Sequence, residues 1–234
     1  MKKYFLFIIP VMVLSVVPLF SADIKAKPDK AKEIKKEISL KPGDIMVADF
    51  EGHPNNLGGA VGVYGDGEPD WSKPAETHSW YYEPQLKDYS RKNVHSGAQS
   101  FRLVHGQKGI SQQWASFGCD LGPDLDISVT PKKVKALDVS QCKSFVFWIK
   151  GAKGGEKFKV IFRDSHAPSY MPQAKTDPLP KGCTQEWQQV VIPLSGIEDR
   201  VDLRNMVHAG LEFGINTGNA KGAVFYLDDW AFVK

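Results

Sequence analysis

The chain has 234 residues, of which 42% are hydrophobic and 24% are charged, and this composition is typical of a globular protein. Its length leaves room for one domain of ordinary size. The net charge of +3 arises at the N-terminus, because residues 1–42 contain nine Lys and four acidic residues. Residues 43–234 contain 21 Lys and Arg against 23 Asp and Glu, and this balance argues against nucleic acid as a partner.

The first 22 residues have the pattern of a secretory signal peptide. Lys2 and Lys3 precede an apolar run over 4–20, and small residues follow that run. A membrane anchor is the competing interpretation, since 17 apolar residues are near the lower limit for a membrane span. Two prolines within the run favour cleavage. We therefore expect a secreted, periplasmic or cell-envelope protein, with no stable membrane insertion after the signal is removed.

Residues 23–42 are rich in Lys and are bounded by Pro28 and Pro42. This composition predicts a solvated linker or a short, marginal helix. Its charges are of mixed sign and no aromatic residue accompanies them, so a spacer is favoured over a surface-binding segment. The linker separates the predicted signal peptide, 1–22, from a domain over 43–234.

From Gly43 onward, short apolar runs alternate with turn residues, and no long stretch shows the period of an amphipathic helix. The predicted strands are 45–51, 100–105, 109–117, 144–150, 158–163, 187–194, 209–215 and 224–233. Strands without intervening helices predict an all-β fold, an antiparallel β-sandwich. Two long irregular stretches, 55–93 and 165–182, are expected to be functional loops.

Three cysteines remain beyond the signal peptide, and an odd number cannot pair completely within one chain. Cys119 closes one predicted strand and Cys142 opens the next, so these two form the better pair for a disulfide. The alternative is that Cys119, Cys142 and Cys183 are buried thiols that pack as small hydrophobic groups. The sequence leaves both interpretations open.

Five segments follow one another in an order that resembles a known group of modules. They are VADFEG over 47–52, VHSGAQSFRL over 94–103, FVFWIKG over 145–151, WQQVVIPLS over 187–195 and YLDDWAF over 226–232. Together they resemble galactose-binding-like carbohydrate-binding modules, particularly family 11, and the complex I intermediate-associated protein 30 domain shares many of them. The resemblance covers 43–234 and implies a jelly-roll fold that binds carbohydrate without catalysing a reaction.

The resemblance also implies a structural calcium ion where the first strand, the loop around Gly97 and the last strand meet. Asp49 and Glu51 project to the same face of a strand because side chains alternate. Calcium takes six to eight oxygen ligands from carboxylates and from the carbonyl groups of irregular loops. The predicted ligands are Asp49, Glu51, Ser96 and Asp228. The alternative is that these groups cap turns or face solvent.

A sugar-binding site needs flat aromatic faces and polar groups that bond hydroxyls. Trp148 and Trp187 lie in apolar strands at positions that the resemblance assigns to the scaffold. The remaining candidates lie in the long irregular stretches or on polar faces of strands. They are Trp80, Tyr82, Trp114, Arg163, Tyr170, His208 and Glu212. Together they predict a concave polysaccharide-binding cleft, and the alternative is a solvated polar face.

The case for catalysis is weaker. Acidic residues that could hydrolyse a glycosidic bond are available, but no spacing singles out a pair. Metal-binding motifs and a glycine-rich phosphate loop are absent from the sequence. The leading hypothesis is a non-catalytic module that binds a polysaccharide, such as a β-glucan, with calcium as a structural cofactor. The alternatives are a small jelly-roll polysaccharide lyase or glycoside hydrolase, and a structural or adhesive envelope protein.

Overall fold

The structure is a computed structural model that describes residues 40–66, 79–82, 89–105, 114–129 and 131–234. The chain divides into two compact units, Met1–Glu33 and Ile34–Lys234, and every described residue belongs to the second unit. The predicted signal peptide and nearly all of the predicted linker lie outside the described residues. Within the described part of the chain, no helix has the length and apolar character needed to cross a membrane.

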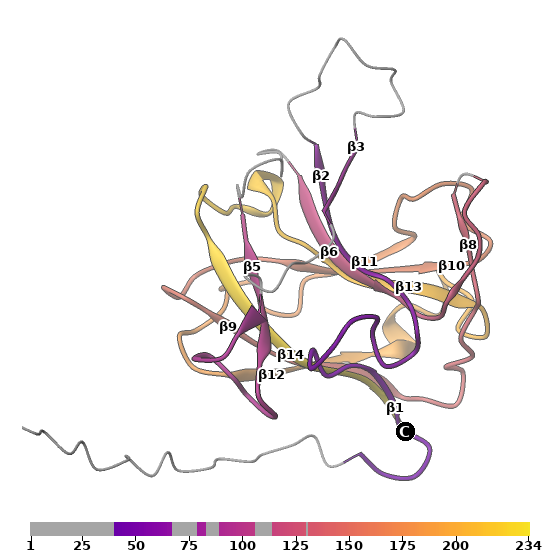
Figure 1. The fold of residues 1–234 in the computed structure, drawn as a ribbon, viewed down its shortest axis with the longest axis horizontal. Helices are drawn as coiled ribbons and strands as arrows, with labels where there is room; N and C mark the ends of the chain where they lie inside the picture. Colours follow the sequence, from indigo (N-terminus) through magenta and orange to yellow (C-terminus); the bar gives the residue numbers. More distant parts are fainter. Residues whose placement is uncertain (1–39, 67–78, 83–88, 106–113, 130) are drawn as a thin grey trace, which may run out of the picture. The chain divides into compact units, whose positions relative to one another are not determined.

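Two antiparallel sheets of six strands each form the domain (Figure 1). Sheet A has the order β12 (Gln188–Pro193), β9 (Ser144–Gly151), β14 (Val224–Val233), β5 (Ser100–Val104) and β4 (Tyr89–Ser90), and β1 (Ile45–Ala48) also pairs with β14. Sheet B has the order β11 (Ala174–Thr176), β10 (Lys159–Asp164), β13 (Met206–Glu212), β6 (Ala115–Asp120), β2 (Val61–Asp66) and β3 (Ser79–Tyr82). The predicted all-β sandwich is therefore confirmed.

Shorter elements connect the strands of the two sheets. A small two-stranded sheet is formed by β7 (Asp124–Asp126) and β8 (Lys133–Val134). Single 3-10 turns follow two of the long strands, η3 (Leu194–Gly196) after β12 and η4 (Ile215–Thr217) after β13. No α-helix occurs in the ranges that the structure describes, so the sheets alone carry the core.

Aromatic side chains from both sheets fill the space between them. Alternation along β9 places Phe145 and Phe147 on the inner face, where both are fully buried. Phe145 of sheet A contacts Phe162 of sheet B edge to face, with 5.5 Å between the ring centroids. Trp230, on a bulge of β14, contacts Phe117 of sheet B at 5.3 Å. Each such ring contributes about 2 kcal/mol through burial, so the core holds the two sheets face to face.

The sequence located most of the strands, but it missed those with weak hydrophobic patterns. The predicted strand 109–117 is β6 at 115–120, because the alternation with inward Phe117 and Cys119 continues beyond the predicted end. The stretch 55–93, predicted to be irregular, contains β2, β3 and β4. The stretch 165–182 likewise contains the three-residue strand β11. Short strands and the glycines of β2 (VGVYGD) give too few apolar residues for a recognisable alternation.

All three cysteines of the domain are buried, unpaired thiols: Cys119, Cys142 and Cys183. The interpretation that they pack as small hydrophobic groups is confirmed, and the Cys119–Cys142 disulfide is not formed. Burial raises the pKa of Cys183 to about 12, and it raises the pKa of Cys119 as well. These thiols are therefore protonated and chemically unreactive at neutral pH.

Candidate functional site

The outer face of sheet B, defined as the side turned away from sheet A, brings together several of the predicted sugar-binding residues. Arg163 on β10 lies beside His208 on β13, and His208 lies beside Asp120 on β6. In a parallel row, Glu212 pairs with Ser116. Because paired residues point to the same side of a sheet, all five project from one face. The sequence predicted this shared face for Arg163, His208 and Glu212, and the register agrees with it.

Asp120 is the centre of a hydrogen-bonded group on this face. Its carboxylate lies 3.2 Å from Nδ1 of His208 and 2.9 Å from Nζ of Lys132, which also lies 2.9 Å from Asp124. Burial favours a higher pKa for Asp120, which is 2% exposed, but the bonds and charges of His208 and Lys132 outweigh burial and lower it. Asp120 is therefore held as a carboxylate whose charge is balanced by its neighbours.

Arg163 and Tyr170 form a stacked pair on the same face. The guanidinium carbon of Arg163 lies 5.3 Å from the centre of the Tyr170 ring. Arg163 is only 5% exposed, whereas Tyr170 is 54% exposed. The Tyr170 hydroxyl accepts a hydrogen bond of 2.8 Å from the backbone N–H of Lys132. These contacts hold an exposed aromatic ring in a fixed orientation, as a sugar-binding surface requires.

Both carboxylate oxygens of Glu212 also have partners within the protein. Nζ of Lys175, on the edge strand β11, lies 2.7 Å from Glu212 Oε2, and Asn216 donates to Glu212 Oε1. Glu212 is 8% exposed, so its negative charge is compensated within the protein. A carboxylate held in this way accepts hydrogen bonds but is poorly suited to act as a free acid or base.

Three glycines form the floor between these groups. Gly210, Gly118 and Gly62 are paired across β13, β6 and β2. The His208 ring lies over this floor, since a Cβ atom on Gly118 would be 2.3 Å from His208 Nε2. Because these positions carry no side chains, the imidazole can lie flat against the sheet, and all three glycines are buried. Sequence reasoning missed the glycine floor and also missed Asp120, Lys132 and Lys175.

The aromatic candidates divide into two groups. Trp114, 38% exposed, directly precedes β6 and shares the parity of Ser116, which points to the outer face. Trp80 and Tyr82 belong to β3, where their backbones pair with Gly65 and Val63 of β2. The side chains of Trp80 and Tyr82 lie outside the described residues. Trp114 and Tyr170 are therefore the aromatic residues that the structure places beside this face.

The four predicted calcium ligands lie at the expected junction but bond protein donors. Glu51 Oε1 accepts from the backbone N–H groups of Ala98 and Gln99 at 2.8 and 3.1 Å. Asp228 Oδ2 accepts from the backbone of His95 and Ser96 at 3.0 and 3.2 Å. These bonds pin the loop 93–100, called the clasp loop here, between the first strand and the last one.

The other two predicted ligands are similarly engaged. The carboxylate of Asp49 accepts from Asn56 Nδ2 at 2.9 Å and from the backbone of Glu51 at 3.1 Å. The Ser96 hydroxyl donates to Asp229 Oδ1 at 2.7 Å. Within the described residues, no three His, Cys, Asp or Glu side chains are grouped so that they could hold a metal ion. In this arrangement the predicted set does not fit calcium, because N–H and O–H groups occupy the oxygens that calcium needs.

Two acidic side chains lie next to each other at this junction. Asp228 and Asp229 are adjacent and almost fully buried, and His95 Nδ1 lies 2.9 Å from Asp229. Burial and the charge of Asp229 raise the pKa of Asp228 to about 8, against the opposing effect of the N–H groups that it accepts from. A proton on Asp228 therefore relieves the repulsion between these two carboxyl groups.

Comparisons with known proteins agree with this fold. Residues 88–234 match the family described as carbohydrate binding domain 30. The family 30 module of the cellulosomal cellulase Cel9D-Cel44B of Clostridium thermocellum is 18% identical, with a TM-score of 0.51, over 82% of this chain and 97% of that chain. Another family 30 module structure is 19% identical, with a TM-score of 0.51, over 81% of this chain and 87% of that one.

A family 11 module from Clostridium thermocellum is 14% identical, with a TM-score of 0.44, over 82% of this chain and 94% of that chain. No curated protein matches the sequence. At these identities, the structural similarity to the family 30 modules establishes a common fold. The family match over most of the described domain adds an assignment by sequence.

Proposed function

Because this chain belongs to the carbohydrate binding domain 30 family, and is therefore a non-catalytic carbohydrate-binding module, we propose that the outer face of sheet B binds a β-glucan polysaccharide. The resemblance to carbohydrate-binding modules seen in the sequence is confirmed, with family 30 as the matching family. The expectation of a binding module without catalytic activity is confirmed by the same assignment.

One observation supports the proposed site: the charged side chains of this face are already paired with one another. Asp120 is balanced by Lys132, and Glu212 by Lys175. A neutral, hydroxyl-rich ligand suits such a face, because it exchanges hydrogen bonds without requiring a countercharge. The Arg163–Tyr170 stack supports the proposal by offering a fixed ring to the apolar side of a sugar. A related module belongs to a cellulosomal cellulase, which favours a β-glucan among neutral polysaccharides.

The test is affinity electrophoresis of the purified protein in native gels containing soluble β-glucan, xyloglucan or mannan. Retardation by β-glucan without a fall in its chain length is the expected result. Trp114→Ala should weaken this binding about tenfold, since an aromatic contact contributes about 1 kcal/mol or more. Tyr226→Ala, on the outer face of sheet A, is the matched control and should bind β-glucan normally. Equal binding by wild type and Trp114→Ala would remove Trp114 from the site.

We also propose calcium as a structural ligand of the junction between Asp228 and the clasp loop. Two adjacent buried carboxyl groups support this proposal, although binding would require the clasp loop to present oxygens in place of N–H groups. The melting temperature should rise when calcium is added to chelator-treated protein, because an ion that binds only the folded state stabilises it. Magnesium is the control. An unchanged melting temperature would leave the hydrogen-bonded clasp loop as the complete junction.

Export is the last part of the proposed function. Lys2 and Lys3 followed by the apolar run 4–20 support cleavage after a signal peptide. Expression of the full chain in a bacterium with a general secretion pathway should give a mature protein that lacks the first 22 residues. Intact mass measurement of the periplasmic and medium fractions tests this. Recovery of the uncleaved chain in the membrane fraction would favour the anchor instead.

A further inference from the structure

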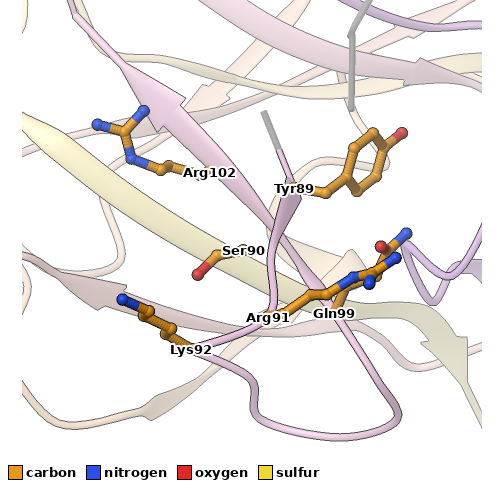
Figure 2. Close-up of a pocket in the computed structure, with 6 residues that line it drawn as sticks. All are labelled: Tyr89, Ser90, Arg91, Lys92, Gln99 and Arg102. Atoms are coloured by element: carbon orange, nitrogen blue, oxygen red, sulfur yellow. The ribbon is translucent and has the colours of Figure 1, made fainter. Parts of the chain in front are cut away.

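A pocket lies at the edge of sheet A, away from the proposed β-glucan face. It has a volume of about 420 Å³ and is lined by Tyr89, Ser90, Arg91, Lys92, Gln99 and Arg102. These residues come from β4, from the turn that follows it and from β5. Figure 2 shows Ser90, Lys92 and Arg102 on one side of β4, with Tyr89, Arg91 and Gln99 on the other. A pocket of this volume accommodates one or two sugar rings.

The charge of this pocket is unbalanced. Arg91, Lys92 and Arg102 supply three cationic groups, and no acidic residue is among the lining residues. Over the described ranges, no carboxylate forms an ion pair with any of these three side chains. Arg91 and Lys92 are exposed, and Arg102 is half-buried. By contrast, Lys132 and Lys175 on sheet B each bond a carboxylate. Lys92 and Arg102 lie on the same side of β4, whereas Arg91 points to the other side (Figure 2), so an anion beside Lys92 and Arg102 would be attracted to these two cations.

The adjoining surface of sheet A continues the pattern with an aromatic ring. Arg102 pairs across the strands with Tyr226, which pairs on its other side with Lys150. Nζ of Lys150 lies 5.8 Å from the centre of the Tyr226 ring and 3.2 Å from Asn93 Oδ1. A ring flanked by two cations offers a stacking surface beside the charged pocket. Such a combination suits a sugar that carries a negative charge.

The overall charge of the domain argues against a densely charged polymer as the ligand. Residues 43–234 are slightly acidic, with 21 Lys and Arg against 23 Asp and Glu. Nucleic-acid-binding domains concentrate basic residues over a wide surface. Here only two cations, Lys92 and Arg102, share one side of the pocket, so it suits one or two anionic groups. The fork of an Arg guanidinium bonds a carboxylate through two parallel N–H groups.

We propose that Lys92 and Arg102, on one side of this pocket, form a second carbohydrate site, which binds the carboxylate of a uronate-containing polysaccharide. Ser90 lies on the same side of β4 as these two cations, and its hydroxyl can bond a hydroxyl group of the same sugar. This site does not depend on the proposed β-glucan site, because the two lie on different sheets. The protein would thus contact a neutral and an acidic polysaccharide at the same time.

Isothermal titration of the purified protein with tetra-galacturonate tests this site, with cellotetraose as the neutral probe of equal length. We expect the double variant Lys92→Gln with Arg102→Gln to bind tetra-galacturonate about tenfold more weakly and cellotetraose unchanged. Lys92→Gln alone alters only an exposed side chain, so it reports on the site even where the Arg102 change unfolds the protein. Arg91→Gln, on the other side of β4, should bind tetra-galacturonate normally. The matched controls are Lys181→Gln and Arg204→Gln, which are exposed elsewhere.

The outcomes separate this site from the β-glucan site. Loss of tetra-galacturonate binding in the pocket variants, with normal binding in Trp114→Ala and in the two controls, supports the acidic site. Equal tetra-galacturonate affinity of wild type and pocket variants overturns it and leaves the β-glucan proposal untouched. Tighter binding of a sulfated oligosaccharide or of anionic phospholipid vesicles than of tetra-galacturonate also overturns the assignment to a uronate.

Discussion

The outer faces of the two sheets differ in how their charges are arranged. On sheet B, the buried Asp120 and Glu212 are matched by Lys132 and Lys175. On sheet A, the cations that line the pocket of Arg91, Lys92 and Arg102 have no acidic residue among the lining residues. A compensated face presents hydrogen-bonding groups to a neutral ligand, whereas an uncompensated one attracts an anion. Under the two proposals above, the two sheets bind chemically different polysaccharides.

The largest expected effect comes from removing the carboxylate at the centre of the sheet B face. Asp120→Ala leaves Lys132 and His208 without their shared partner in a buried setting. We expect a loss of about 2 kcal/mol in the free energy of unfolding, because the contacts of the buried carboxylate with His208 and Lys132 are lost, although Lys132 keeps its contact with Asp124. Urea denaturation measures this loss.

Asp124→Ala is the matched control for this change. Its carboxylate bonds the same Lys132 but its side chain is 36% exposed. Its removal should lower the free energy of unfolding by less than about 1 kcal/mol. Equal losses for Asp120→Ala and Asp124→Ala would mean that the sheet B face does not depend on a buried, compensated centre.

A second change alters the shape of the sheet B face while keeping its charges. In Gly118→Ala, the added methyl group would lie 2.3 Å from His208 Nε2, so the imidazole must move off the glycine floor. We expect about 2 kcal/mol of destabilisation and weaker β-glucan binding in affinity electrophoresis. Binding of tetra-galacturonate at the edge of sheet A should be unaffected. Normal β-glucan binding by a folded Gly118→Ala protein would show that the floor is not part of the site.

Residues that belong to an alternating pattern within one strand could be predicted from the sequence. The alternation of Phe145 and Phe147 in β9, and of Val160 and Phe162 in β10, marks the inner faces directly, so the sandwich and its core were predictable. The same alternation assigned Arg163, His208 and Glu212 to outward positions. Their position on one face of one sheet then followed from the order of the strands.

The remaining site residues depend on pairings between distant segments, which alternation within one strand does not reveal. Lys132 reaches Asp120 from the segment that leads into β8, and Lys175 reaches Glu212 from the three-residue strand β11. Gly118 and Gly210 form a floor only because β6 and β13 are in register. At the edge of sheet A, Lys92 lies just beyond the two-residue strand β4, which has no recognisable period, and Arg102 lies in β5. Each of these groups is defined by its tertiary contacts.

Ionic strength should affect ligand binding at the two faces differently, because salt screens the attraction between charges. Raising sodium chloride from about 0.05 M to about 0.5 M shortens the screening length to a few ångströms and should weaken tetra-galacturonate binding about fivefold. Binding of cellotetraose should change little, because a neutral ligand has no net charge to screen. Isothermal titration at both salt concentrations measures the two affinities. Equal salt sensitivity of the two ligands would indicate that a single charged surface binds both.

The smallest expected effect is a change with pH in the stability that Asp120 contributes. The pKa of Asp120 lies below 3.8, its ordinary value, because His208 and Lys132 outweigh the effect of burial. A lowered pKa means that the unfolded chain takes up this proton at a higher pH than the folded one. The stability that Asp120 contributes is therefore present above pH 3.8 and is lost as the pH falls through its folded-state pKa.

Asp120→Asn isolates this contribution, since it retains the shape of the side chain but carries no titrating carboxyl group. The difference in unfolding free energy between wild type and Asp120→Asn should be constant near neutral pH and should narrow below pH 3.8. Urea denaturation at a series of pH values measures it, and Asp124→Asn serves as the exposed control. If the difference in unfolding free energy stays constant down to about pH 2, protonation of Asp120 does not weaken its contacts with His208 and Lys132. The contribution of Asp120 to stability would then not be electrostatic.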